Sequence, residues 1–202
     1  MDQRVRRLIT MGAVALICLI LVTAPVPAAP RDPLKAASIA LAVHRVTALH
    51  LEGFGATYTD QRSRVPLASY RADVDFAPAA TREQISSTPQ GFLKAARAAN
   101  ATVREVPHGT EVSFTAGGQA FVGLITAGNE VDRVLTWVDG QGRGDLLVET
   151  LFRDYEKTSS GVWFPTHITQ NRGGYPALDV WMSAVAITTS ETSPLERAAS
   201  SR

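Results

Sequence analysis

Apolar and polar positions follow a two-residue period along much of the chain beyond residue 50, as they do in strands with one buried face. The pattern is clearest in residues 146–187. There, three segments rich in Val, Ile, Thr, Phe, Trp and Tyr are separated by EKTSSG and NRGGYP. Such segments joined by Gly, Ser, Asn and Pro clusters are typical of consecutive antiparallel hairpins. We therefore predict a meander in residues 146–187.

Further strands are predicted before this meander. LHLEGFGATYTD begins at about Ala48, and SYRADVDF alternates apolar with charged residues, which predicts one buried and one solvated face. ATVREV, TEVSFTA, QAFVGLITA and VDRVLTWV continue the series, with turns at PHG, GGQ, GNE and GQGRG. We expect about eight strands.

Two helices are predicted, each opened by a capping residue followed by proline. Asp32-Pro33 starts the first. Behind it, apolar residues recur at helical spacing: Ile39, Ala42, Val43, Val46 and Leu49. Thr88-Pro89 starts the second, which Asn100 should end, and TREQISS before it is predicted to be a short polar connection. The pattern predicts an α+β domain whose sheet is mainly antiparallel and is covered by two helices.

The register of the EKTSSG hairpin stays open at this stage. With an odd loop Phe152 and Phe164 share a face, and with an even loop Tyr155 and Phe164 do, because a one-residue slip exchanges the faces.

The first 28 residues have the layout of a secretory signal peptide. Arg4, Arg6 and Arg7 precede an apolar run over residues 8–24, and APVPAAP supplies small residues and helix breakers. Cleavage after Ala28 would send the chain to the periplasm or outside the cell. The alternative is an uncleaved membrane anchor formed by residues 8–24. The remaining chain divides into a single domain at 29–187 and a mobile polar tail at 188–202.

The charge balance gives no reason to expect nucleic acid or an anionic membrane surface as a partner. Of 20 basic and 19 acidic residues, residues 1–28 hold three and one, which leaves 17 against 18. The single cysteine, Cys18, lies in the apolar run, so the predicted mature chain has neither a disulfide nor a cysteine-ligated metal.

No motif for catalysis, metal binding or cofactor binding emerges from the remaining polar residues. The four histidines lack metal-ligand spacing, and residues 158–161 lack a nucleophile elbow. Asp73 and Asp75 share one face of a strand, but that face is expected to be solvated, which disfavours acid–base catalysis. We therefore predict no catalytic residue, no metal and no cofactor.

Apolar side chains are the better candidates for a site. Either they form an ordinary core, or an incompletely covered concave sheet holds an apolar ligand or a protein partner. The candidate ligand-binding residues are Phe121, Trp137, Phe152, Phe164, Ile168 and Trp181.

From about Ser69 to Ile187 the chain resembles the N-terminal domain that precedes the catalytic domain in secreted metallo-β-lactamase-fold hydrolases. The resemblance is carried by SYRADVDFAPAATREQI, TPQGFLKAARAANATV, TWVDGQGRGDLLVETLFRDY and GVWFPTHITQNRGGYPALDV. FRDY together with SSGVWFPTHI is also similar to a strand pair of LolA/LolB-like periplasmic lipoprotein carriers. That second resemblance implies a half-barrel, a curved sheet wrapped on helices with an apolar concavity.

Two departures limit what this resemblance implies. The segment between the TREQI and TPQGF motifs is shorter here, and no catalytic domain is expected after the last strand. No family metal ligand can be placed on a residue of this chain, so hydrolase activity does not carry over. The sequence thus predicts an exported, non-catalytic module that binds a lipid or other apolar ligand, or a protein partner, on its concave face. The alternative is a detached N-terminal domain that acts with a metallo-hydrolase catalytic domain on another chain.

Overall fold

The computed structural model describes residues 32–59, 61–76, 81–140 and 144–190. The elements are, in chain order, α1 (Pro33–Ala40), β1 (Val46–Tyr58), β2 (Arg64–Asp75), α2 (Arg82–Ser87), α3 (Pro89–Ala98), β3 (Thr102–Val106), β4 (Gly109–Ala116), β5 (Gln119–Ile125), β6 (Val131–Asp139), β7 (Asp145–Lys157), β8 (Trp163–Arg172) and β9 (Tyr175–Thr189). The predicted α+β class with a mainly antiparallel sheet is confirmed. The described residues contain nine strands and three helices, so the predicted totals of about eight and two were too low.

The nine strands form one open antiparallel sheet in the order β2-β1-β9-β8-β7-β6-β5-β4-β3. From β3 to β9 each strand pairs with its successor, which confirms the predicted meander and extends it. The first hairpin joins at the other end, because β1 pairs with β9. β2 and β3 are therefore the two outer strands.

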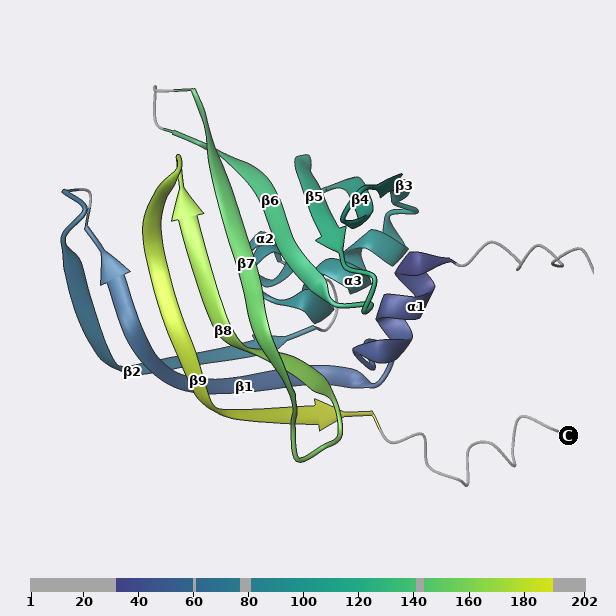
Figure 1. Ribbon diagram of the computed structural model, residues 1–202, viewed down its shortest axis with the longest axis horizontal. Coiled ribbons are helices and arrows are strands. Elements are labelled where there is room, and N and C mark those ends of the chain that lie inside the picture. The colour runs from purple at the N-terminus through teal and green to yellow at the C-terminus, as the bar shows by residue number, and fades with distance from the viewer. Residues whose placement is uncertain (1–31, 60, 77–80, 141–143, 191–202) are drawn as a thin grey trace, which may run out of the picture. The chain divides into compact units, whose positions relative to one another are not determined.

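The sheet is strongly curved, and the bend is visible in β1, β2, β8 and β9 (Figure 1). In β1 the pairing register shifts around Gly53 and Gly55 against both neighbouring strands. A Cβ added to Gly53 would overlap the carbonyl oxygen of Trp181, and one added to Gly55 would overlap that of Asp179. The two glycines thus let β1 and β9 approach closely at an irregular, bent point of the ladder.

The first helix begins where the sequence predicted. Asp32 is the N-cap and accepts a hydrogen bond from the backbone N–H of Lys35 at 2.9 Å, and Pro33 occupies the first helical position. The cap satisfies one of the free donors at the helix start.

This helix ends earlier than the apolar spacing predicted. Ala42 has a φ of 50°, in the left-handed region, and Val46 already belongs to β1. The helical assignment of Val46 and Leu49 was wrong because both residues pair in the sheet, and Ile39 is 61% exposed rather than buried. The helix instead buries Leu34, Ala37 and Ser38.

The segment TREQISS forms helix α2 and is not the connection that was predicted. Thr81 accepts a hydrogen bond from the backbone of Gln84 at 3.3 Å, and the Gln84 side chain accepts one from the backbone of Thr81 at 2.7 Å. This capping box, written T-x-x-Q in the sequence, stabilises a helix start even in a polar segment.

Helix α3 follows after the single residue Thr88. Thr88 accepts from the backbone N–H of Gly91 at 3.1 Å, which confirms the predicted N-cap, and donates to the carbonyl of Gln84 at 2.9 Å. One buried hydroxyl thereby joins the end of α2 to the start of α3. Asn100, with a φ of 50°, follows the end of α3 as predicted.

The core lies between the helices and one face of the sheet. Contacts join α3 to β4, α2 to β6 and α1 to β5, and Figure 1 shows the helices beside this part of the sheet. The ring centroids of Phe92 and Phe114 lie 5.4 Å apart, as do those of Phe114 and Phe121. Burial of each such side chain contributes on the order of 1.5–3 kcal/mol.

The β7–β8 hairpin has an odd loop. Lys157 pairs with Trp163, which leaves residues 158–162 between them, and Phe152 pairs with Ile168 farther along. Phe152 and Phe164 are both buried, so the first of the two registers left open by the sequence is the correct one.

Strand β9 continues to Thr189, past the predicted domain end at residue 187, and Ser190 donates its backbone N–H to the carbonyl of Arg45 at 2.7 Å. The predicted signal peptide (1–28) and residues 191–202 of the predicted tail lie outside the described residues. Within the described part of the chain, no helix has the length and apolar character needed to cross a membrane.

Candidate functional site

The six predicted ligand-binding residues do not form one cluster. Phe121, Phe152, Phe164 and Ile168 lie in the core, each at most 4% exposed. Trp137 is 37% exposed and Trp181 is 42% exposed, and both follow a buried strand residue, so they lie on the opposite, convex face. The core four therefore pack the helices against the sheet, and the two tryptophans cannot join them on the concave face.

Trp181 belongs to an aromatic group on the convex face. Its ring stacks on that of His167 with centroids 3.9 Å apart, and Phe54 lies opposite it in β1. His167 Nε2 also lies 2.8 Å from Asp179 Oδ1. The rest of this face is crossed by ion pairs, including that of Arg153 with Asp132 at 2.7 Å.

The concave face is not completely covered by the helices. A cleft of about 880 Å³, here termed the distal cleft, lies among the β1–β2 hairpin, the β8–β9 hairpin and the start of β7. It is lined by Thr57, Tyr58, Thr59, Arg62, Leu146, Gln170, Arg172, Tyr175, Pro176, Ala177 and Leu178. Its volume falls within the usual range for small-molecule sites, which is roughly 300–1,000 Å³.

Strand alternation places the distal cleft on the same face as the core. Gln170 lies two residues beyond the buried Ile168, and its partner Leu178 lies two residues before the buried Val180. Leu146 lies two residues before the buried Val148. Residues two apart on a strand share a face, so the cleft continues the concave face beyond the helices.

The distal cleft combines apolar, neutral polar and cationic groups. Leu146, Leu178 and Pro176 supply apolar surface, and Gln170 donates to Thr150 Oγ1 at 3.4 Å. Arg62 lies over the ring of Tyr175, with its Cζ 3.6 Å from the ring centroid. The cleft can therefore take up a ligand with an apolar part and a polar or charged end.

The sequence prediction missed the residues of this cleft. It selected mainly large aromatic side chains, most of which lie in the core. It did not include Leu146 and Leu178, which lie next to the hairpin turns. In the sequence, both residues continue the two-residue period of apolar positions toward a turn, and this position is the signal that could have identified them.

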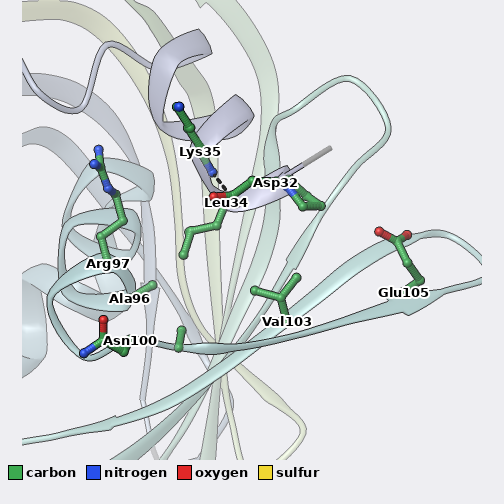
Figure 2. Close-up of a pocket in the computed structure, with 10 residues that line it drawn as sticks. Asp32, Leu34, Lys35, Ala96, Arg97, Asn100, Val103 and Glu105 are labelled. Atoms are coloured by element: carbon green, nitrogen blue, oxygen red, sulfur yellow. Dashed lines mark hydrogen bonds between the residues drawn. The ribbon is translucent and has the colours of Figure 1, made fainter. Parts of the chain in front are cut away.

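A second pocket, of about 630 Å³, lies between the start of α1, the end of α3 and β3. Figure 2 shows Leu34, Ala96 and Val103 around it, while the charged ends of Lys35, Arg97 and Glu105 point outward. Its lining carries both signs of charge and therefore favours neither an anion nor a cation.

The acidic residues examined as catalytic candidates lie in a solvated setting. Asp73 is exposed, and its carboxylate lies 2.5 Å from His50 Nδ1, while Glu52 lies 3.4 Å from His50 Nε2. Hydrogen bonds to Asp73 and then to Glu52 raise the pKa of His50 above its ordinary value. Across the described ranges, no group of three or more His, Cys, Asp or Glu side chains is arranged to hold a metal ion.

Comparisons of the chain with protein-family models, curated proteins and solved structures found no match. The resemblance to the accessory domain of metallo-β-lactamase-fold hydrolases, and that to LolA/LolB-like carriers, therefore stay predictions based on sequence motifs.

Proposed function

We propose that this protein is a non-catalytic binding module that holds an apolar ligand in the distal cleft of its curved sheet. The main support is the position of the cleft on the face that carries the core, beyond the reach of the helices. Apolar side chains there have no helix packed over them, so a ligand could bury them against its own apolar surface.

Two adjacent leucines of β7 provide a matched test. Leu146 lines the distal cleft, whereas Leu147 is 36% exposed and alternates onto the convex face. Binding of the neutral dye N-phenyl-1-naphthylamine can be followed by its fluorescence. Leu146→Gln should weaken binding about tenfold, since about 1.4 kcal/mol of apolar contact is lost.

Leu147→Gln should leave the dye affinity unchanged, and circular dichroism should show both variants folded. Absence of dye binding to the native protein would contradict the proposal. Equal losses in the two variants would also contradict it, because the dye would then not depend on the concave face.

We further propose that the module works after export, as its N-terminal segment indicates. The basic start, apolar run and small-residue end of residues 1–28 support cleavage after Ala28. Expressed in a bacterial host, the protein should be recovered from the periplasm with Ala29 as its first residue by mass spectrometry. Recovery of an unprocessed chain in the membrane fraction would favour the anchor formed by residues 8–24.

A further inference from the structure

We infer that the ligand of the distal cleft is an anionic amphiphile, with its apolar chain on Leu146 and Leu178 and its anionic head at Arg62 and Arg172. This inference rests on the proposed function and adds the charge of the ligand to it. It depends on the balance of charges in the cleft, on the position of the two arginines and on the apolar surface beside them.

The described lining of the cleft carries positive charge without a matching negative charge. It includes Arg62 and Arg172 and contains no carboxylate. Elsewhere, several arginines contact at least one acidic side chain: Arg71, Arg82, Arg104, Arg133 and Arg153. Among the described residues, Arg45, Arg64 and Arg97 resemble the cleft arginines in having no ion pair with a carboxylate. In the part of the chain that the structure describes, neither cleft arginine takes part in an ion pair with a carboxylate.

Both arginines are next to Tyr175. Arg172 is opposite Tyr175 across the β8–β9 hairpin, and the guanidinium of Arg62 lies over the Tyr175 ring. Arg172 also donates from Nε to Gln170 Oε1 at 3.3 Å, which leaves its terminal nitrogens to other acceptors. Two guanidinium groups in the lining of one cleft can bind a carboxylate or a phosphate, whose oxygens match their donors.

The turn that carries Arg62 adopts a conformation that is unusual for arginine. Arg62 has a φ of 62°, and its backbone N–H donates to the carbonyl of Thr59 at 2.8 Å. A glycine or asparagine would adopt this left-handed conformation more readily. Such strained positions concentrate at binding sites, where the side chain is required in one place.

The apolar residues of the cleft lie beside its charged end. Pro176 follows Tyr175 directly in β9, Leu178 lies two residues farther on, and Leu146 of β7 lines the same cleft. A ligand with an anionic head at Tyr175 can therefore lay its chain along these residues. A cationic amphiphile would instead bring like charges together at the head.

Calorimetric titration of the purified protein with four ten-carbon amphiphiles tests this inference. Decanoate and decyl phosphate carry anionic heads, decanol is neutral and decyltrimethylammonium is cationic. We expect both anions to bind at least about tenfold more tightly than the other two, as a charge-assisted hydrogen bond allows. The tighter of the two anions identifies the head group as carboxylate or phosphate.

Variants locate the head group in the cleft. Arg62→Gln and Arg172→Gln should each weaken binding of the preferred anion about tenfold and leave decanol binding unchanged. Arg104→Gln, on the outer strand β3, is the matched control and should change neither. Equal affinity for decanoate and decanol, or no effect of both cleft variants, would overturn the anionic assignment while leaving the proposed apolar site intact. Failure of all four compounds to bind would overturn the proposed function as well.

Discussion

Gly123 of β5 sets how closely α3 packs on the sheet. A Cβ at this position would overlap the ring of Phe92, which is completely buried. Gly123→Ala should therefore lower the free energy of unfolding by about 1–3 kcal/mol, because the ring has no free space to move into. Denaturant unfolding followed by circular dichroism measures the change.

Gly128→Ala is the control for this substitution. The added Cβ would meet only the hydroxyl of Thr126, at an ordinary contact distance of 3.5 Å. Its effect should stay within about 0.5 kcal/mol. If Gly123→Ala were equally mild, the contact between Phe92 and the sheet would not be as tight as described.

The exposed residue His50 provides a test of the charge network on the convex face. Its pKa is raised above about 6.5, chiefly by the hydrogen bond to Asp73. NMR titration of the His50 ring should give a midpoint above that value, and Asp73→Asn should lower it. Asp75→Asn is the control, because Asp75 lies opposite Ala48 rather than His50 and should not move the midpoint.

The raised pKa also fixes the sign of the pH dependence. Protonated His50 interacts with two carboxylates in the folded chain, so its stabilising contribution is fully present below about pH 6.5. That contribution is lost as the pH rises through the raised pKa. A midpoint at or below 6.5, unchanged by Asp73→Asn, would contradict the hydrogen bond.

At the scale of elements, Thr88 is the residue on which the α2–α3 pair depends. It is completely buried, caps α3 and donates to the last turn of α2. Thr88→Ala should cost about 1–2 kcal/mol of unfolding free energy, since it removes a cap and leaves the half-buried carbonyl of Gln84 without this donor.

Thr88→Ser should recover most of this loss, because the hydroxyl is retained. Thr115→Ala, at an exposed position of β4, is the control and should have little effect. Equal destabilisation by Thr88→Ser and Thr88→Ala would mean that the lost methyl group, and not the hydrogen bonds, matters.

Local signals explain why the starts of the helices and the meander could be predicted. Asp32-Pro33 and Thr88-Pro89 mark caps that form within three residues, and each hairpin turn lies between alternating segments. The same local spacing predicted the wrong element at Val46 and Leu49. Whether an apolar residue joins a helix or a strand there is decided by pairing with β9, which lies far away in the sequence.

The candidate site was harder to predict for a related reason. Large aromatic side chains are the obvious candidates for an apolar site in a sequence, but Phe121 and Phe152 are buried in the core of the folded domain. What remains open is decided by how far these helices extend over the sheet. The alternation that reaches Leu146 and Leu178 indicates which face they are on, but not how far the helices cover that face.

Across the described domain, the two faces of the sheet have different characters. The convex face carries ion pairs together with exposed aromatic groups such as Trp181, whereas the concave face packs against the helices at the core and is open at the distal cleft. The proposed ligand therefore binds at the uncovered end of the concave face. Trp181→Ala should accordingly leave ligand affinity unchanged.

The most direct measurement is NMR mapping of methyl groups during titration with decanoate. Binding in the distal cleft predicts that the methyl signals of Leu146 and Leu178 shift in a saturable way. The signals of Leu147 on the convex face and of Leu93 in the core should stay in place. Saturable shifts at Leu147 with unmoved signals at Leu146 and Leu178, or no saturable shift at all, would contradict the account.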